Sequence, residues 1–178
     1  MNLKPTLLYV GAVLIGGACA FLITKLQEKP VSSSPVVVGK VTQLSDKERV
    51  NLCKKDNVCK ILSEVGFYEA RSEGDKGMKA VMFVVLNRVE HPKFPDSVHK
   101  VVSQPYQFSY RHDGSMKKGF NDKASYERSL IIAHKVLGKE LKDLTNGSTF
   151  YHTKSVFPKW RLKFKQEVII KNHIFYTM

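Results

Sequence analysis

The hydrophobic positions of this chain follow a helical spacing from about Ser45 to Gly138. Asp46 supplies a capping side chain, so a first helix is predicted to begin there. A second helix is predicted over about residues 57–72. One side of this second helix carries an apolar stripe, formed by Ile61, Leu62, Val65 and Tyr68.

Glu69 lies on the same stripe, four residues after Val65 and eight after Ile61. Glu73 extends that edge of the helix, but at its end and beside Gly74. Because side chains at these spacings share one helix face, we expect Glu69 to be the carboxylate that is partly removed from water.

Three further helical features follow along the chain. The segment KGMKAVMFVVLNRVEHP fits a buried helix or a very apolar strand, and its length and polar end favour a helix that ends at Pro92. A short helix is predicted after Asp96 or Ser97 as N-cap. An aromatic loop, QPYQFSYRHDGSMKKGFND, leads to an amphipathic helix that Asp122 caps and Gly138 ends.

The pattern changes after Asn146-Gly147. The segments STFYHT and EVIIKNHIFYT alternate and are rich in β-branched and aromatic residues, which predicts two strands with FPKW between them. We therefore expect an α+β fold, mainly helical, with a small C-terminal β element. Residues 44–178 are predicted to form a single domain.

The N-terminal segment carries no charge between Lys4 and Lys25, over about 20 residues, which is enough to cross a bilayer. Residues 1–26 are predicted to be a signal anchor or a cleaved signal peptide with Ala18-Cys19-Ala20 at its cleavage site. A lipoprotein signal ending at Cys19 is a third interpretation, although Gly16 departs from it. Residues 27–43 have the composition of a linker. All three interpretations export the rest of the chain, to the inner membrane or the periplasmic side of a bacterial envelope.

The net charge narrows the choice of partners. The chain has 29 basic and 16 acidic residues, a formal charge of +13 and a pI near 9.7. Residues 1–40 hold four of the basic residues and one of the acidic ones, so the remaining domain keeps a charge of +10. Such a surface attracts polyanions, and export argues against nucleic acid and for anionic lipid or acidic envelope polymers.

Cysteines and histidines give few signs of a metal site. Cys53 and Cys59 can form a disulfide in an oxidising compartment or remain two thiols. No histidine pair has the spacing of a zinc motif, so no metal or other cofactor is predicted. A zinc amidase built from scattered histidines remains an alternative.

A buried carboxylic acid offers a different chemistry. Burial beside Phe67 and Tyr68 should raise the pKa of Glu69, because burial disfavours the charged form. A glutamic acid that keeps its proton can donate it to a glycosidic oxygen. The competing interpretation is an ion pair between Glu69 and Arg71, Arg88 or a lysine.

Five blocks in series now carry a resemblance. YEARSEGDKGMKAVMFVVLNRV, FPDSVHKVVSQPYQFS, STFYH, FPKW and HIFY resemble the spore-cortex-lytic type of cell-wall hydrolase, which occurs in bacteria and in phage lysis proteins. The resemblance runs from about residue 58 to the C-terminus. It implies a lysozyme-like catalytic domain that cuts the N-acetylmuramic acid–N-acetylglucosamine linkage, often as a lytic transglycosylase. It also implies that the glutamate of the EAR block, Glu69, is the catalytic acid.

The matching blocks suggest further site residues. Those expected to contact the glycan are Gln107, Phe108, Ser109, Tyr151, Trp160, His173 and Tyr176. Asn87 and Arg88 are expected to support the site from a neighbouring helix. Glu73 has an uncertain role, because Ser72 departs from the family's usual EARGE. Candidates for a second carboxylate, by proximity in sequence alone, are Glu73, Asp75, Asp113 and Asp122.

Together these features predict an exported peptidoglycan glycosidase of the phage-endolysin type. Its partners would be peptidoglycan glycan strands and, through the N-terminal segment, a membrane. A non-catalytic cationic envelope-binding protein and a metal-dependent amidase are the alternatives. The sequence does not indicate an oligomeric state.

Overall fold

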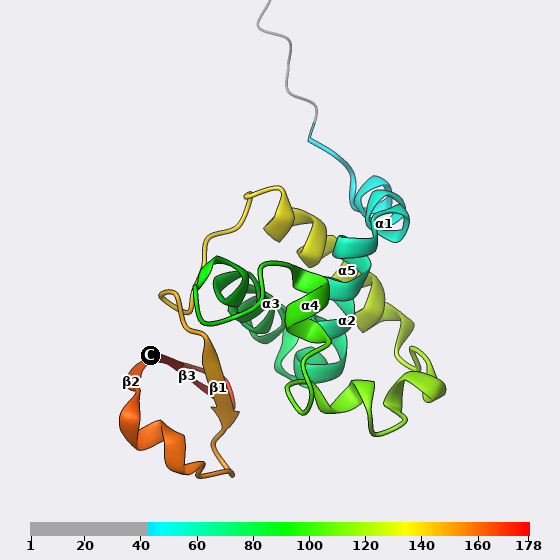
Figure 1. Cartoon of the computed structure of the whole chain (residues 1–178). Helices are drawn as coiled ribbons and strands as arrows, with labels where there is room; N and C mark the ends of the chain where they lie inside the picture. Colours follow the sequence, from blue (N-terminus) through cyan, green and yellow to red (C-terminus); the bar gives the residue numbers. More distant parts are fainter. Residues whose placement is uncertain (1–42) are drawn as a thin grey trace, which may run out of the picture. The chain divides into compact units, whose positions relative to one another are not determined.

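The computed structural model describes residues 43–178 (Figure 1). The predicted signal segment and nearly all of the predicted linker lie outside these residues. Within them, no helix is both long enough and apolar enough to span a bilayer. The α-helices are α1 (Asp46–Lys55), α2 (Asn57–Ala70), α3 (Gly74–Glu90), α4 (Val98–Val102) and α5 (Lys123–Leu137). The described residues also form four short 3-10 helices, η1 (Arg71–Glu73), η2 (Ser109–Arg111), η3 (Ser115–Lys118) and η4 (Lys159–Lys163).

Capping side chains set where the helices begin. Ser45, and not Asp46 as expected, caps α1. The hydroxyl of Ser45 accepts from the backbone N–H of Glu48, and the Glu48 carboxylate accepts from the backbone N–H of Ser45 at 2.8 Å. This reciprocal pair is a capping box, which leaves Asp46 in the first turn. Asp122 caps α5 as predicted.

The second helix ends earlier than predicted. It stops at Ala70, and residues 71–73 tighten into η1 before Gly74 turns the chain with a φ of 67°. Glycine suits this left-handed conformation because it has no Cβ. The turn brings α3 alongside α2, and α3 is the buried helix that the sequence favoured over a strand.

Helix α2 contacts α1, α3, α4 and α5, so it lies at the centre of the helical core. Close approach of α2 and α3 depends on Gly66, where an added Cβ would lie 2.3 Å from Cε of Met82. Fully buried side chains at these helix contacts include Leu62, Val65, Val81, Met82, Val85, Leu130 and Ala133.

The C-terminal region forms three strands, not two. They are β1 (Phe150–Thr153), β2 (Lys165–Ile170) and β3 (His173–Thr177), in the order β1-β3-β2 with antiparallel pairs. The segment predicted as one long strand folds back at Lys171-Asn172, where Lys171 has a φ of 54°. Two polar residues within an apolar run were the sequence signal for this hairpin.

The two faces of the sheet contact different partners. Successive residues of a strand point to opposite faces, and paired residues share a face. Tyr151 pairs with Phe175, and this face packs on Ala80 and Val84 of α3. The opposite face carries the neighbouring cross-strand pair, Phe150 and Tyr176, and is covered by η4. Its aromatic contacts involve Phe150, His152, Tyr176, Trp160 and Phe164.

A disulfide between Cys53 and Cys59 joins the end of α1 to the start of α2, with 5.1 Å between the two Cα atoms. Both residues are at most 1% exposed. The bond therefore fixes the sharp turn that places α1 against the core.

Reduction of this disulfide is expected to lower the free energy of unfolding by about 2 kcal/mol, because a short cross-linked loop restricts the unfolded chain. Urea unfolding of the wild type with and without a reductant measures the effect. The Cys53→Ala/Cys59→Ala variant is the control and should not respond to the reductant. Equal midpoints for oxidised and reduced wild type would contradict the prediction.

Candidate active site

The candidate site centres on Glu69, in the last turn of α2. Its Oε2 atom accepts a hydrogen bond of 2.9 Å from the hydroxyl of Tyr151, which β1 supplies from 82 residues further along the chain. Glu69 is partly buried, as its place on the apolar stripe predicted. Among the hydrogen bonds of residues 43–178, none reaches its other oxygen, Oε1.

Burial is the main influence on the charge of this pair. It raises the pKa of Glu69, and the nearby charge of Asp113 acts in the same direction. The Tyr151 hydrogen bond and the charge of Arg88 act against this rise. Burial and the neighbouring Glu69 raise the pKa of Tyr151 well above its ordinary value, so its hydroxyl keeps its proton and is the donor.

None of the ion pairs among the described residues includes Glu69. The part of the chain that the structure describes therefore does not contain the ion pair with Arg71, Arg88 or a lysine that was the competing interpretation of this carboxylate. Arg88, one of its proposed partners, is 4% exposed and donates from Nε to the backbone carbonyl of Thr149 at 2.7 Å. Its guanidinium lies between 5.2 and 5.7 Å from the ring centroids of Phe94, Phe108 and Phe150. Arg88 thus holds the start of β1 and acts on Glu69 through its charge alone.

Asn87, the residue before Arg88 on α3, supports the same strand. Its Nδ2 atom donates to Oδ2 of Asp143 and to the carbonyl of Ser148, both at 3.0 Å. These bonds fix the loop that precedes β1. Asn87 and Arg88 therefore brace the strand that carries Tyr151, and their supporting role in a glycan site stays a prediction.

Glu73 lies at the end of η1 and faces the hairpin. Its Oε2 atom accepts a 2.8 Å hydrogen bond from the backbone N–H of Asn172, in the turn between β2 and β3. Gly77 leaves room for this side chain, because an added Cβ there would lie 2.2 Å from Cβ of Glu73. Glu73 thus ties the sheet to the helices and is not placed as a partner acid of Glu69.

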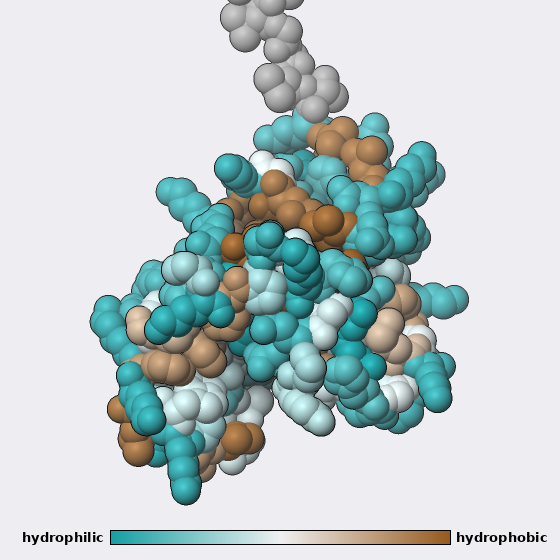
Figure 2. Space-filling model, in the orientation of Figure 1, coloured by the Kyte–Doolittle hydropathy of each residue, from teal (hydrophilic) through white to brown (hydrophobic). Residues whose placement is uncertain are grey.

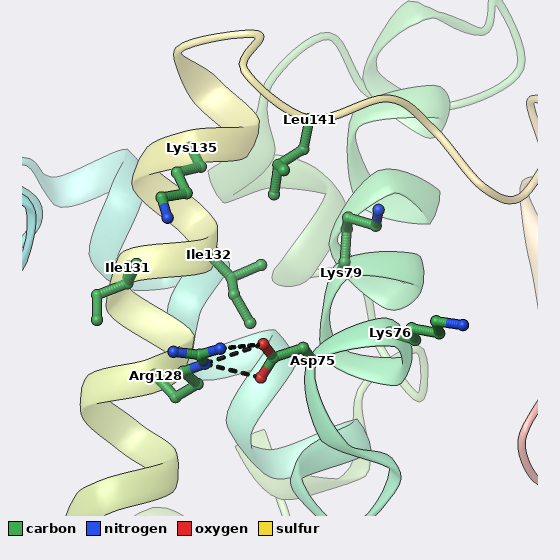
Figure 3. Close-up of a pocket in the computed structure, with 8 residues that line it drawn as sticks. All are labelled: Asp75, Lys76, Lys79, Arg128, Ile131, Ile132, Lys135 and Leu141. Atoms are coloured by element: carbon green, nitrogen blue, oxygen red, sulfur yellow. Dashed lines mark hydrogen bonds and ion pairs between the residues drawn. The ribbon is translucent and has the colours of Figure 1, made fainter. Parts of the chain in front are cut away.

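The remaining candidates for a second carboxylate, Asp75, Asp113 and Asp122, have different environments in the structure. Asp75 lies in a groove between α3 and α5, where Arg128 binds both its oxygens at 2.6 to 2.9 Å (Figure 3). Asp122 is occupied as the N-cap of α5. Only Asp113 among these three carries a charge that raises the pKa of Glu69.

A polar pocket of about 280 Å³ lies between the end of α2 and the aromatic loop, and Glu69 is not among the residues that line it. Tyr68 and Tyr110 stack within it, with ring centroids 4.7 Å apart. Arg71, Ser109 and Asp113 are also in its lining. The sequence had not assigned Tyr68, Arg71 or Tyr110 to the site, although the density of aromatic residues in the loop was a signal.

The predicted glycan-contact residues of the loop have different environments. Gln107 and Ser109 are exposed, and Ser109 lines the polar pocket. Phe108 corrects the expectation, because it is 0% exposed and its ring belongs to the helical core. Alternate positions of this loop point inward and outward, so three consecutive residues do not share one surface.

The aromatic residues of the sheet are divided in the same way. His173 lies edge-on to Tyr151, with 5.3 Å between ring centroids, and burial lowers the pKa of His173. Tyr176 lies on the opposite face, where its hydroxyl is 3.0 Å from Nε2 of His152. Trp160 packs on that same face. The structure therefore brings Tyr151 and His173 to the side of Glu69 and leaves Trp160 and Tyr176 on the other side.

The comparisons with known proteins give the family. The family described as Cell Wall Hydrolase matches residues 72–176, more than half of the chain. The chain belongs to this family. Glu69 lies three residues before the matched range.

The sequence relatives of this cell wall hydrolase include spore cortex-lytic enzymes. That of Bacillus subtilis is 35% identical over 69 residues, or 39% of this chain and 23% of the relative. That of Halalkalibacterium halodurans is 38% identical over 61 residues, or 34% of this chain and 18% of the relative. The match thus covers about a fifth of the length of these curated relatives.

Solved structures extend the similarity beyond the sequence match. The catalytic domain of the germination-specific lytic transglycosylase SleB from Bacillus anthracis has a TM-score of 0.57 at 26% identity, covering 68% of this chain and 95% of that one. The catalytic domain of SleB from Bacillus cereus has a TM-score of 0.56 at the same identity, covering 68% and 90%. This cell wall hydrolase therefore has the mainly helical, lysozyme-like fold with a small sheet that the sequence predicted.

Removal of the Tyr151 hydroxyl should raise the pKa of Glu69 further. The hydrogen bond favours the charged carboxylate, so Tyr151→Phe removes an influence that lowers this pKa. Titration of the Glu69 carboxyl carbon by NMR in wild type and variant measures the shift. Tyr106→Phe is the control, because Tyr106 is 95% exposed, and it should leave the Glu69 titration unchanged. A lower or unchanged pKa in Tyr151→Phe would contradict the expectation.

Proposed function

We propose that the protein is a peptidoglycan-degrading glycosidase that cleaves the N-acetylmuramic acid–N-acetylglucosamine linkage with Glu69 as general acid. The observation that carries the proposal is the partly buried Glu69 carboxyl, with its raised pKa and its Tyr151 hydrogen bond. Membership of the cell wall hydrolase family and the fold of the SleB catalytic domains support the same reaction class.

In the proposed first step, Glu69 donates its proton to the glycosidic oxygen as the bond from that oxygen to C1 of the muramic acid breaks. The leaving N-acetylglucosamine keeps the oxygen as a hydroxyl. Glu69 becomes a carboxylate, which the hydroxyl of Tyr151 stabilises by its hydrogen bond. One oxygen of Glu69 is thus held by Tyr151, and the other is the one assigned to proton donation.

The proposed second step is that of a lytic transglycosylase. The C6 hydroxyl of the same muramic acid attacks C1 and gives its proton to the Glu69 carboxylate, which forms a 1,6-anhydro ring and restores the acid. This route needs a single carboxylate, and a lytic transglycosylase is what the Bacillus anthracis neighbour is described to be. In a muramidase, water would attack C1 instead. The candidate to assist that water is Asp113, because it is the carboxylate whose charge acts on Glu69.

Replacement of the acid tests the mechanism. Glu69→Gln keeps the shape and an acceptor for Tyr151 but has no proton to donate, so lysis should fall by about 10² to 10⁴-fold. The assay is turbidity loss of purified cell walls, and mass spectrometry of the fragments should show 1,6-anhydro ends. Asp75→Asn is the matched control, since Asp75 is bound by Arg128 in another groove and its exposed ion pair contributes little.

The outcomes separate the alternatives. Equal lysis by Glu69→Gln and wild type would overturn the role of Glu69. Loss of lysis with EDTA would favour the metal-dependent amidase, although no cluster of three potential ligands occurs within residues 43–178. Binding to cell walls without any release of fragments would favour the cationic envelope-binding protein. Fragments with reducing ends only would replace the transglycosylase by the muramidase.

The proposal includes export to the bacterial envelope and a phage-type endolysin role, at the inner membrane or on its periplasmic side. The uncharged segment between Lys4 and Lys25 and the positive charge of the remaining chain support it. Fractionation of cells that express the full chain should place it in the membrane or periplasmic fraction. Recovery in the cytosol would contradict this part of the proposal.

A further inference from the structure

The connection between β1 and β2 combines exposed apolar side chains with positive charge. Together with Lys165, the first residue of β2, it has the sequence KSVFPKWRLKFK (residues 154–165), with five basic residues and no acidic one. Three of its apolar side chains are unusually exposed: Val156 at 51%, Phe157 at 71% and Leu162 at 78%. Single exposed apolar residues are common on soluble proteins, but three within seven residues and among cations need an explanation.

This connection has a fixed structure. Trp160, in η4, packs on the sheet with ring centroids 5.3 Å from Phe150 and 5.5 Å from Tyr176. Phe164 closes the same cluster at 4.5 Å from Phe150. Because these two rings face inward, Phe157 and Leu162 project from a firmly attached element.

The connection also lies apart from the candidate active site. It covers the face of the sheet opposite Tyr151. Figure 1 shows η4 on the side of the sheet away from the helices, and Figure 2 shows hydrophobic side chains among hydrophilic ones at that end of the domain. A partner on this surface would therefore leave Glu69 accessible.

We propose that residues 154–165 dock on the surface of a bilayer that contains anionic lipids. Such an interface accepts apolar side chains at the level of the headgroups and attracts the surrounding Lys and Arg side chains. Each basic residue near an anionic membrane strengthens binding by about fivefold. Lys165 also pairs with Glu167 at 3.0 Å, which leaves Lys154, Lys159, Arg161 and Lys163 as the principal contributors.

A glycan strand fits this surface less well. Sugars are bound by flat aromatic rings, and Val156 and Leu162 offer none. Phe157 has a ring, but the guanidinium of Arg161 lies 5.4 Å from its centroid. The combination of exposed aliphatic and basic side chains is thus better matched by lipid than by sugar. The proposal is independent of the reaction at Glu69.

The test uses the full chain and a local probe, because the uncharged N-terminal segment can itself bind vesicles. Phe157→Trp places a fluorophore on the surface, and the spectrum of the wild type, with Trp160 as its one tryptophan, is subtracted. Vesicles of phosphatidylglycerol and phosphatidylcholine should shift the emission of residue 157 to the blue. Brominated lipids should quench it. Tyr106→Trp is the matched control, at a site that is 95% exposed, and should show neither change.

Charge reversal provides the second arm. Lys159→Glu/Lys163→Glu in the Phe157→Trp background should raise the lipid concentration needed for the blue shift by at least about tenfold. Near-ultraviolet circular dichroism and cell-wall lysis equal to those of the parent establish that the variant is folded. The same spectrum for residue 157 with and without anionic vesicles would overturn the proposal. A blue shift of the residue 157 emission with purified sacculi but not with vesicles would also overturn the proposal, and it would favour contact with glycan.

Discussion

The hydrogen bond between Tyr151 and Glu69 is the constraint on which the site depends. It joins the last turn of α2 to β1 across 82 residues, so both elements must be held in place independently. Helix α2 is fixed by the core and by the turn at Gly74. Strand β1 is fixed by Asn87 and Arg88, which bind the loop and backbone at its start. The residues around the pair thus serve mainly to keep one carboxyl and one hydroxyl in contact.

This arrangement acts against stability at neutral pH. Burial raises the pKa of folded Glu69, so the stability from this group is present below the unfolded pKa and is lost as the pH rises through the folded pKa. The Tyr151 hydrogen bond reduces that loss because it favours the charged form. A helical core and the disulfide between α1 and α2 offset the remaining cost. A buried group with a raised pKa is common at functional sites, which agrees with the role proposed for Glu69.

Local patterns in the sequence predicted much of this structure. The 3.6-residue period located the helices. It also identified Glu69 as the carboxylate that is partly buried, because the position of a residue on the apolar stripe of a helix sets its burial directly. Ser45 was missed as a cap because Asp46 is also a good capping type, although the spacing of Ser45 and Glu48 is the sequence signature of the capping box that the structure shows. The partner of Glu69 could not be derived from local patterns, because Tyr151 reaches it through the pairing of distant elements. Phe108 was assigned to the wrong environment since neighbouring loop residues lack a periodic pattern that separates inside from outside.

The strand period explains how one small sheet can serve two surfaces. Tyr151 and Phe175 face the helices, whereas their neighbours Phe150 and Tyr176 face Trp160 in η4. A one-residue change of register would exchange these sets and remove both the Tyr151 hydroxyl from Glu69 and the support of η4. The aromatic cluster under η4 therefore protects the register that the site requires. The same cluster holds Phe157 and Leu162 outward, so the geometry of the site and the exposure of the basic connection have a common physical origin.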